Sequence, residues 1–383
     1  MSILLVTNDF PPTVGGIQSY LRDFAAEVVR HAGTDNLIVF ASTHDAAAAA
    51  QWDASVDYTV IRARQKVLLP TPAVRAQMQR IIREFDVDTV WFGAAAPLAV
   101  LGSAARSAGA RRVVATTHGH EVGWSMVPGA RSVLRRIGDS SDVVTYISRY
   151  TLGRFRPAVG EKTQYVALPS GVDTNFFRPA TAAQRLATRQ RWGLGEAPVI
   201  VCASRLVARK GQDQLIRALP EIRRRCPGAV LVIIGAGSYG TTLRRYARHL
   251  EPADRDAVIF TGPVERSDMR DLVAAADVFA MPARTRGGGL DVEGLGIVYL
   301  EAQACAVPVV AGDSGGAPEA VGEGAGVVVD GRDLAHIVES IAGLLNDATC
   351  RTSMGKAGRE FVERHFSWDE LGRRCYRVLT PQG

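Results

Sequence analysis

The chain has 383 residues, more than one hydrophobic core normally serves, so two domains are expected. Its 47% hydrophobic and 22% charged residues are typical of a globular protein and argue against a disordered one. The net charge of +6 is carried almost entirely by arginine and favours anionic partners such as phosphates or an acidic membrane face. Nucleic acid is not favoured as a partner, because the arginines form no stripe interleaved with aromatic residues.

The first residues, MSILLVTNDFPP, predict a strand rather than a signal peptide, because the apolar run is short, lacks a basic lead and ends in a Pro-Pro turn. No apolar run approaches the roughly 18–20 residues that cross a bilayer. The five cysteines are scattered and form no CxxC pair. They predict a reduced, cytoplasmic protein without a disulfide framework or a zinc knuckle.

Short apolar runs alternate with amphipathic segments along the chain. The runs predict strands at 3–7, 36–41, 89–93, 112–117, 143–148, 164–168, 199–204, 230–235, 258–262, 278–282, 308–312 and 326–330. Between them, helices are predicted for example at 17–29, 213–224, 242–250 and 334–345. Continuous apolar strands separated by helices indicate parallel sheets, so the fold class is α/β with two Rossmann-like, doubly wound domains.

The domain boundary is predicted near 168–180, where Pro169, Gly171 and Pro179 interrupt a stretch without periodicity. The first domain is then 1–168, and the second begins at 169. Ligands of doubly wound sheets bind at the carboxyl ends of the strands, where loops lead into helix N-termini. Motifs that directly follow a strand are therefore candidate binding sites.

Two motifs of the first domain meet this condition. Gly15-Gly16 follows the first strand and opens a helix, where glycines let the backbone approach an anion; a merely flexible loop is the alternative. THGHE follows the strand at 112–117. His118, His120 and Glu121 could bind a metal, but a hydrogen bond from His118 to a polar substrate is favoured, and a buried structural histidine remains open. Asp86 and Asp88 resemble a DxD metal clamp, but they precede a strand and so lie at the wrong end of the sheet.

Two further motifs lie in the second domain. SRLVARKGQ at 204–212 places Arg205 and Lys210 in one strand-to-helix loop, which suits two adjacent phosphates; a solvated loop is the alternative. GAGSYG at 235–240 matches the GxGxxG pattern of dinucleotide-binding domains. The acidic residue expected about 20 residues later is missing, so the motif predicts a tight strand–helix turn rather than NAD binding.

The segment ARTRGGGLDVEGLGIVYLEA at 283–302 combines a glycine run with carboxylates on both sides of a helix start. Glu293 precedes the helix, and Glu301 lies about one turn inside it. Main-chain N–H groups around Leu295, Gly296, Ile297 and Val298 can bind a phosphate, while carboxylates accept hydrogen bonds from sugar hydroxyls. The arrangement suits a nucleotide sugar.

Taken in order, these motifs resemble the GT-B glycosyltransferases of family four. The resemblance rests on GGIQ at 15–18, GVDTNFFRP at 171–179, SRLVARKGQ, GAGSYG, SGGAPE at 314–319 and the Glu293/Glu301 pair, and it covers nearly the whole chain. It implies two domains that face each other across a cleft, 1–168 for the acceptor and 169–363 for the nucleotide sugar. A closing helix at 364–379, within a terminal segment 364–383, should cross back to the first domain.

Longer stretches, among them THGHEVGWSM and MPARTRGGGLDVEGLGIVYLEA, resemble the actinobacterial branch of the family that elongates phosphatidylinositol monomannoside. This implies GDP-mannose as the donor, a lipid acceptor in phospholipid biosynthesis for the cell envelope, and a peripheral location on the inner face of the plasma membrane. Each candidate residue then receives a role. Gly16, Arg205 and Lys210 should hold the diphosphate, Glu301 the ribose, Glu293 the mannose hydroxyls, His118 the transferred sugar, Val264 the base, and Asp9 and Gln18 the acceptor.

The resemblance also implies transfer with retention of configuration. We expect substitution on one face of the sugar through an oxocarbenium-like state, with the departing phosphate accepting the proton of the acceptor hydroxyl. Arg205, Lys210 and the helix N–H groups would stabilise the leaving diphosphate in place of a metal ion. No metal cofactor is therefore expected.

A lipid acceptor requires a surface that meets a membrane. The segments 62–70 with 71–85, and 130–138, mix arginines with aliphatic residues and are candidates for it; amphipathic helices that pack their apolar sides inward are the alternative. Two other functions stay open at this level. One is a sibling transferase with another nucleotide sugar or a soluble glycan acceptor, and the other is a nucleotide-binding module without catalysis.

Overall fold

The computed structural model describes residues 1–380 and divides into two compact units. Unit 1 joins the first 170 residues to the segment that begins at Trp368, and unit 2 is Gly171–Ser367. Unit 1 contains a seven-stranded parallel sheet in the order β3-β2-β1-β4-β5-β6-β7. Its strands are β1 (Ser2–Thr7), β2 (Leu37–Ala41), β3 (Thr59–Arg62), β4 (Val87–Phe92), β5 (Arg112–Thr116), β6 (Val143–Tyr146) and β7 (Gln164–Ala167). Its helices are α1 (Gly16–Ala32), α2 (Ala46–Asp53), α3 (Pro72–Glu84), α4 (Gly102–Ser107), α5 (Glu121–Ser125), α6 (Pro128–Ser140), α7 (Arg149–Val159) and α16 (Trp368–Leu379), with 3-10 turns at Thr34–Asn36 and Leu98–Leu101.

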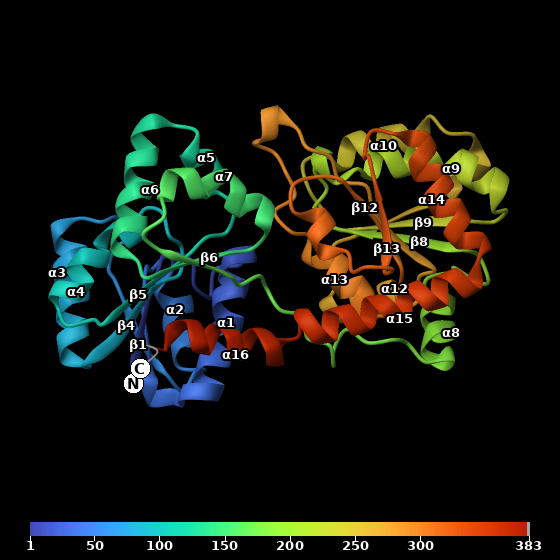
Figure 1. Ribbon diagram of the computed structural model, residues 1–383. Coiled ribbons are helices and arrows are strands. Elements are labelled where there is room, and N and C mark those ends of the chain that lie inside the picture. The colour runs from blue at the N-terminus through green and yellow to red at the C-terminus, as the bar shows by residue number, and fades with distance from the viewer. Residues whose placement is uncertain (381–383) are drawn as a thin grey trace. The chain divides into compact units, whose positions relative to one another are not determined.

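Helices cover both faces of this sheet, as Figure 1 shows for α1 and α16 on one side and α3 and α4 on the other. Alternate residues of β1 point to the two faces, so that Leu4 and Val6 belong to the core beneath α3 and α6. The helix α1 forms because its apolar residues recur at helical spacing, with Leu21, Phe24 and Val28 buried. The helix α16 packs beside α1.

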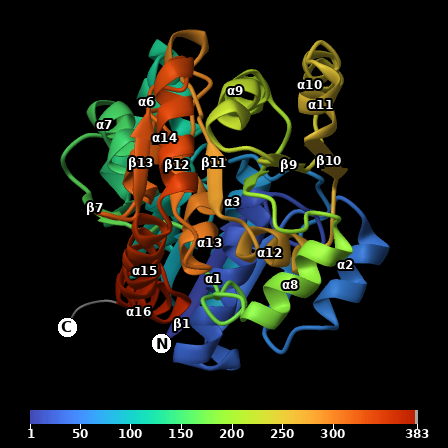
Figure 2. The same ribbon diagram turned by 90° about the vertical axis from the view of Figure 1, so that its right-hand side faces the viewer.

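Unit 2 repeats the plan with a six-stranded parallel sheet in the order β10-β9-β8-β11-β12-β13. Its strands are β8 (Val199–Ala203), β9 (Val230–Ile234), β10 (Val258–Gly262), β11 (Val278–Met281), β12 (Val309–Gly312) and β13 (Gly326–Val329). Its helices are α8 (Ala182–Arg191), α9 (Gln212–Arg225), α10 (Gly240–Arg248), α11 (Pro252–Asp256), α12 (Arg266–Ala274), α13 (Ile297–Ala304), α14 (Leu334–Asn346) and α15 (Ala348–His365), with 3-10 turns η3 (Ala208–Lys210), η4 (Gly287–Gly289) and η5 (Ala317–Ala320). In Figures 1 and 2, α9 and α14 lie together on one face of the sheet, and α12 and α13 lie on the other.

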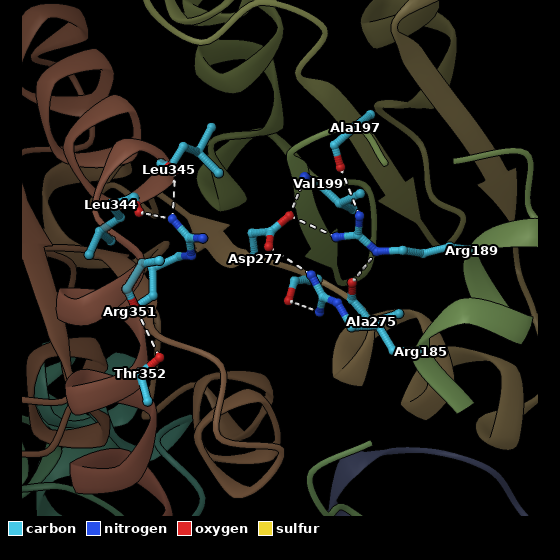
Figure 3. Close-up of polar contacts among 12 residues, drawn as sticks. Arg185, Arg189, Ala197, Val199, Ala275, Asp277, Leu344, Leu345, Arg351 and Thr352 are labelled. Atoms are coloured by element: carbon cyan, nitrogen blue, oxygen red, sulfur yellow. Dashed lines mark hydrogen bonds and ion pairs between the residues drawn. The ribbon is translucent and has the colours of Figure 1, made fainter. Parts of the chain in front are cut away.

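An arginine–aspartate cluster fixes the amino ends of β8 and β11 (Figure 3). The Asp277 carboxylate binds Arg185 at 2.7 Å and Arg189 at 2.8 Å, and it accepts the main-chain N–H of Val199 at 2.8 Å. Arg189 also donates to the carbonyl of Ala197. Because the Arg189 side chain is only 8% exposed, this pair ties α8 to the sheet from within.

The predicted strands agree with those observed to within about two residues at either end, and β3 was not predicted at all. β3 is a four-residue edge strand with no buried position, so it lacks the continuous apolar run that marks the others. The closing helix predicted at 364–379 is instead two helices, because the chain leaves the helical conformation at Phe366 (φ −129°). There the carbonyl of Phe366 accepts the N–H of Val172, which holds residues 366–367 in unit 2.

Both sheets reverse their strand order beside the first strand, between β1 and β4 in unit 1 and between β8 and β11 in unit 2. The loops that leave these strands at their carboxyl ends form the position where doubly wound sheets bind ligands. In unit 1 these loops begin at Asn8 and Gly93, and in unit 2 they begin at Ser204 and Pro282. Among residues 1–380, no helix is long and apolar enough to cross a membrane.

Candidate active site

The loop between β8 and α9 carries the cationic residues of unit 2. Lys210 ends the turn η3 and is 8% exposed, whereas Arg205 is exposed and, within the described residues, has no hydrogen-bond or ion-pair partner for its guanidinium. The side chain of Gln212 fixes the loop by donating to the Ser204 hydroxyl and to the carbonyl of Arg205. At Gly211 (φ +78°), a Cβ would lie 2.1 Å from the carbonyl oxygen of Pro282, so only glycine allows this close approach.

Lys210 forms an ion pair with Glu293, 2.6 Å from its Nζ to the carboxylate. Arg209 lies beside this pair, 3.9 Å from the Glu293 carboxylate and 3.6 Å from that of Asp291. The Glu293 side chain is 9% exposed. Two cations and two carboxylates from separate loops therefore meet at the carboxyl end of β11, the end at which ligands bind.

The loop from Pro282 to Gly296 is held by contacts at its base. Arg284 donates from its main chain to the carbonyl of Arg209 and binds the buried Asp213 at 2.8 Å through its side chain. The three glycines at 287–289 all have positive φ, of 56°, 65° and 96°. Side chains other than glycine rarely adopt this region, which explains the glycine run.

The helix α13 begins at Ile297 after Gly296 (φ +91°). At the start of a helix the first N–H groups have no partner within the helix, so those of Ile297 and Val298 are available where the sequence predicted anion binding. Glu301 lies one turn further and is only partly accessible to solvent. Burial raises the pKa of its carboxyl to about 7, against a smaller opposing effect of Arg266.

The glycines of GAGSYG pack against the cationic loop. A Cβ at Gly235 would lie 2.2 Å from the carbonyl oxygen of Ser204, and one at Gly237 would lie 2.3 Å from that of Leu206. The N–H of Leu206 donates to Ala236, and the carbonyl of Leu206 accepts from Tyr239. The motif is therefore the tight strand–helix turn predicted from the sequence, and it supports the loop of Arg205 and Lys210.

In unit 1, the loop after β1 brings Asp9 and Gln18 together, with the amide of Gln18 donating to the Asp9 carboxylate at 2.9 Å. Burial raises the pKa of Asp9, partly opposed by His120 and His44. Gly16 begins α1 and is exposed, and a Cβ there would meet nothing within 4 Å. The fold of unit 1 alone therefore does not require glycine at this position.

His118 lies at the carboxyl end of β5, beside the loop after β4. Its Nε2 is 2.7 Å from the carbonyl oxygen of Gly93, and since a carbonyl only accepts, Nε2 carries the hydrogen. Burial lowers the pKa of His118 to about 4, so the ring is neutral at pH 7 and its Nδ1 is a hydrogen-bond acceptor. The edge of the ring packs against Tyr20 with centroids 4.9 Å apart.

The fully buried Glu121 positions this histidine. Its carboxylate accepts the N–H groups of His118 at 3.1 Å and Gly119 at 3.0 Å, and it lies 3.3 Å from Nε2 of His120. Because the carboxylate of Glu121 accepts these two main-chain N–H groups, it holds the conformation of the loop that carries His118. In the described part of the chain, no group of three or more His, Cys, Asp or Glu residues has the geometry of a metal site.

The chain is similar to known glycosyltransferases over nearly its whole length. Residues 14–176 match the profile described as "Glycosyltransferase Family 4", and residues 184–361 match "Glycosyl transferases group 1". The chain is 54% identical to the "GDP-mannose-dependent monoacylated alpha-(1-6)-phosphatidylinositol monomannoside mannosyltransferase" of Corynebacterium glutamicum, over 99% of this chain and 98% of that one. It is also 54% identical to the "GDP-mannose-dependent alpha-(1-6)-phosphatidylinositol monomannoside mannosyltransferase" of Mycolicibacterium smegmatis, with the same coverage.

The chain belongs to glycosyltransferase family 4. Among solved structures, it resembles Anabaena Alr3699/HepE in complex with UDP, with a TM-score of 0.79 at 21% identity over 99% of both chains. A glycosyltransferase from Rickettsia africae gives a TM-score of 0.76 at 17% identity, over 100% of this chain and 99% of that one. The GT-B fold class, with two Rossmann-like parallel-sheet domains, and the glycosyltransferase class predicted from the sequence are confirmed.

Within each unit of this family-4 enzyme, the predicted residues gather at the ligand-binding end of the sheet. Unit 2 places Arg205, Lys210 and Glu293 between β8 or β11 and the helix that follows, Glu301 in α13, and Val264 after β10. Unit 1 places Asp9, Gly16 and Gln18 after β1, and His118 after β5. The roles of these residues stay predictions.

Sequence reasoning missed several residues that shape the site. Arg209 lies in the same loop as Lys210, so the rule that selected Lys210 could have found it. Asp213 and Arg284 are 71 positions apart and meet only through the fold. Ser314 contacts Glu293 N–H at 3.3 Å and belongs to the SGGAPE motif, which was quoted for the family resemblance without a role.

The two segments proposed to meet a membrane combine buried helices with exposed apolar residues, and their contact with a membrane stays a prediction. The helix α3 buries its apolar residues Val74, Met78, Ile81 and Ile82, and α6 buries Leu134 and Ile137. The helices therefore pack inward, as their amphipathic periodicity allows. The exposed large apolar side chains lie just before them, at Val67 and Leu69 and at Met126 and Val127.

Proposed function

We propose that this enzyme transfers mannose from GDP-mannose to the sugar of a phosphatidylinositol monomannoside lipid. The observation that carries the proposal is the 54% identity, over nearly the full length, to enzymes whose names state this donor and acceptor. The loops of unit 2 support it, because they offer cations for a diphosphate and carboxylates for hydroxyl groups at the ligand-binding end of one sheet.

Different residues of unit 2 are proposed to bind the diphosphate, the nucleoside and the mannose of the donor. Arg205 and Lys210 hold the diphosphate together with the N–H groups of residues 295–298. Glu301 accepts hydrogen bonds from the ribose hydroxyls, and the base lies near the main chain of Val264. The carboxylate of Glu293 accepts hydrogen bonds from mannose hydroxyls.

Unit 1 is proposed to contribute to the sugar and the acceptor. Neutral His118 keeps Nδ1 free to accept a hydrogen bond from a hydroxyl of the transferred mannose, because its Nε2 is engaged by Gly93. Gly16 is proposed to let the diphosphate approach the start of α1, because glycine leaves the helix N-terminus without a side chain. The Asp9–Gln18 pair presents carboxylate and amide groups to the acceptor.

Transfer is proposed to proceed on one face of the sugar. The bond from the anomeric carbon to the β-phosphate oxygen breaks, and the acceptor oxygen bonds to the same carbon from the same side. The acceptor's proton passes to the departing phosphate oxygen. Arg205, Lys210 and the α13 N–H groups stabilise the negative charge that develops on that oxygen, which is the contribution a metal ion makes in other enzymes.

The acceptor is a lipid, so a peripheral position on the cytoplasmic face of the membrane is proposed. The surface made of Met126, Val127, Arg131, Arg135 and Arg136, here called the α6 surface, supports this location. Its apolar and basic residues are exposed, and its three arginines line a hollow of about 520 Å³ between α6 and α7. Apolar side chains beside arginines are typical of segments that lie in an anionic membrane interface.

The test incubates the protein with GDP-mannose and phosphatidylinositol monomannoside and measures the mass of one added hexose. Lys210→Ala and Glu293→Ala should each lower turnover by about 10²–10³ with the fold intact, because each removes a group that stabilises the transition state. EDTA should leave the activity unchanged, and strict dependence on Mg²⁺ or Mn²⁺ would contradict the proposed charge stabilisation.

Two alternatives are decided by the same assay. Transfer from UDP- or ADP-linked sugars, but not from GDP-mannose, would indicate a sibling transferase of the family. GDP binding without any transfer or hydrolysis would indicate a nucleotide-binding module.

A further inference from the structure

Lys210 and Glu293 are proposed to contact different parts of the donor, yet in this structure they bind each other. The distance from Nζ to the carboxylate is 2.6 Å, and the side chains are 10% and 9% exposed. A buried lysine and a buried glutamate are each costly to leave unpaired. A ligand that separates them must therefore supply a new partner to both.

The backbones on both sides of this pair are fixed. The N–H of Glu293 meets the hydroxyl of Ser314, and its carbonyl accepts the N–H of Gly316 at 2.8 Å. On the other side, Gly211 abuts Pro282 directly after Lys210. Because these contacts hold the backbones, we expect the pair to separate by rotation of its two side chains.

A complete nucleotide sugar and a nucleoside diphosphate differ in the partners that they offer to Lys210 and Glu293. A complete donor offers a diphosphate to Lys210 and sugar hydroxyls to Glu293, so both buried groups regain a partner. A nucleoside diphosphate alone takes Lys210 and leaves Glu293 with Arg209, whose Nε is 3.9 Å away. The free diphosphate must therefore compete with the Glu293 carboxylate for Lys210.

We propose that Glu293 acts as this competitor, so that the site discriminates the loaded donor from the spent nucleotide. After transfer the sugar has left, Glu293 recaptures Lys210, and release of the nucleoside diphosphate is favoured. This inference rests on the proposed function and adds a second role to Glu293, that of a specificity-determining residue. The role requires no group beyond those already in the loops.

The test measures binding of GDP by calorimetry to the wild type and to Glu293→Gln, Lys210→Met and the double variant. Glu293→Gln removes the competing charge at constant size, so GDP should bind about tenfold more tightly, within the range of coupling between residues in contact. In the Lys210→Met background, the same change should leave GDP affinity within about twofold. If Glu293 competes with GDP for Lys210, the effect of Glu293→Gln on GDP affinity must depend on the presence of Lys210.

Asp291→Asn is the matched control. It removes a carboxylate from the same loop, 3.6 Å from Arg209, that is not paired with Lys210. General electrostatic attraction of the diphosphate would tighten GDP binding similarly in Asp291→Asn and Glu293→Gln, and equally in both Lys210 backgrounds. Either result, or an unchanged GDP affinity in Glu293→Gln, would overturn the inference.

If the wild-type protein binds no GDP, the proposed donor is wrong, and this inference fails with it. Thermal melting of each variant shows that the fold is retained.

Discussion

At the scale of single residues, the site depends on groups whose chemistry is set by burial. His118 is neutral because desolvation lowers its pKa to about 4, and its tautomer follows from the Gly93 carbonyl. Glu301 shows the opposite effect, since burial raises the pKa of its carboxyl. These states are not visible in the sequence, because they arise from neighbours distant along the chain.

Glu301 predicts a dependence of stability on pH. Its pKa of about 7 in the folded protein lies above the ordinary 4.5 of the unfolded chain, so the folded state binds the proton more tightly. The resulting stabilisation is present below pH 4.5 and is lost as the pH rises through 7. Relative to Glu301→Gln, the ligand-free wild type should therefore lose about 1–3 kcal/mol of unfolding free energy between pH 5 and pH 8.

Chemical denaturation of the two proteins at both pH values measures this difference. Glu323→Gln is the control, because it removes an exposed carboxylate of the same unit. An equal change with pH in wild type and Glu301→Gln would show that Glu301 does not titrate in this range.

Substitution of Gly16 by alanine should affect the stability of the protein and its affinity for the donor in opposite directions. A Cβ at this position meets no protein atom within 4 Å, and alanine is favoured over glycine within a helix, so Gly16→Ala should be stabilised by up to about 1 kcal/mol. If the diphosphate approaches here, the same methyl group should weaken GDP-mannose binding by at least roughly tenfold. Thermal melting and calorimetry measure the two effects, and unchanged donor affinity would remove Gly16 from the site.

At the scale of elements, buried polar contacts hold the loops around the site. Arg284–Asp213 and Ser314–Glu293 fix the long loop after β11, and the GAGSYG turn supports the loop after β8. Buried polar contacts of the same kind hold the opposite end of the unit 2 sheet. There Asp277 holds α8 against β8 (Figure 3).

The Asp277 cluster predicts a large effect on stability. Asp277→Ala leaves the Arg189 guanidinium buried with its charge uncompensated, and should lower the free energy of unfolding by about 3–5 kcal/mol. Asp268→Ala is a matched control, because it removes the exposed pair between α12 and Arg191 of the same helix α8 and should cost much less stability. Urea denaturation compares the two variants. Equal losses would mean that the burial of Arg189 does not determine the cost.

At the scale of the whole molecule, the net charge of +6 could attract an anionic membrane through the whole surface or through one basic patch. We expect the α6 surface to bind anionic vesicles, with each arginine contributing about 1 kcal/mol at low salt. Replacing Arg131, Arg135 and Arg136 by glutamine should thus weaken binding by about 100-fold. Flotation with phosphatidylglycerol-containing vesicles at low and high salt measures this loss.

Three exposed arginines of unit 2, Arg245, Arg248 and Arg255, provide the control for this surface. Their replacement by glutamine changes the net charge by the same amount at a different place. Equal losses in the two triple variants would attribute binding to overall charge. Wild-type binding in the α6 variant would exclude this surface as the docking site.

The sequence by itself determined the two parallel sheets and the positions of the candidate site residues. Continuous apolar runs such as 199–204 mark strands covered on both faces, and a motif that follows such a run must lie at the ligand-binding end of the sheet. Arg205, Lys210 and Glu293 could be selected in this way. The edge strand β3 could not, because its four residues, Thr59–Arg62, hold only two adjacent apolar side chains and form no continuous apolar run.

Only the tertiary structure decided which side chains meet. The Lys210–Glu293 pair joins residues 83 positions apart, and Arg284 of the long loop after β11 binds Asp213 at the start of α9. It also decided which apolar residues of 62–85 and 126–138 stay exposed, and which ionisable groups are neutral. The physical reason is common to these cases. Burial and close contact depend on packing between distant segments, whereas periodicity records only the side of its own element on which a residue lies.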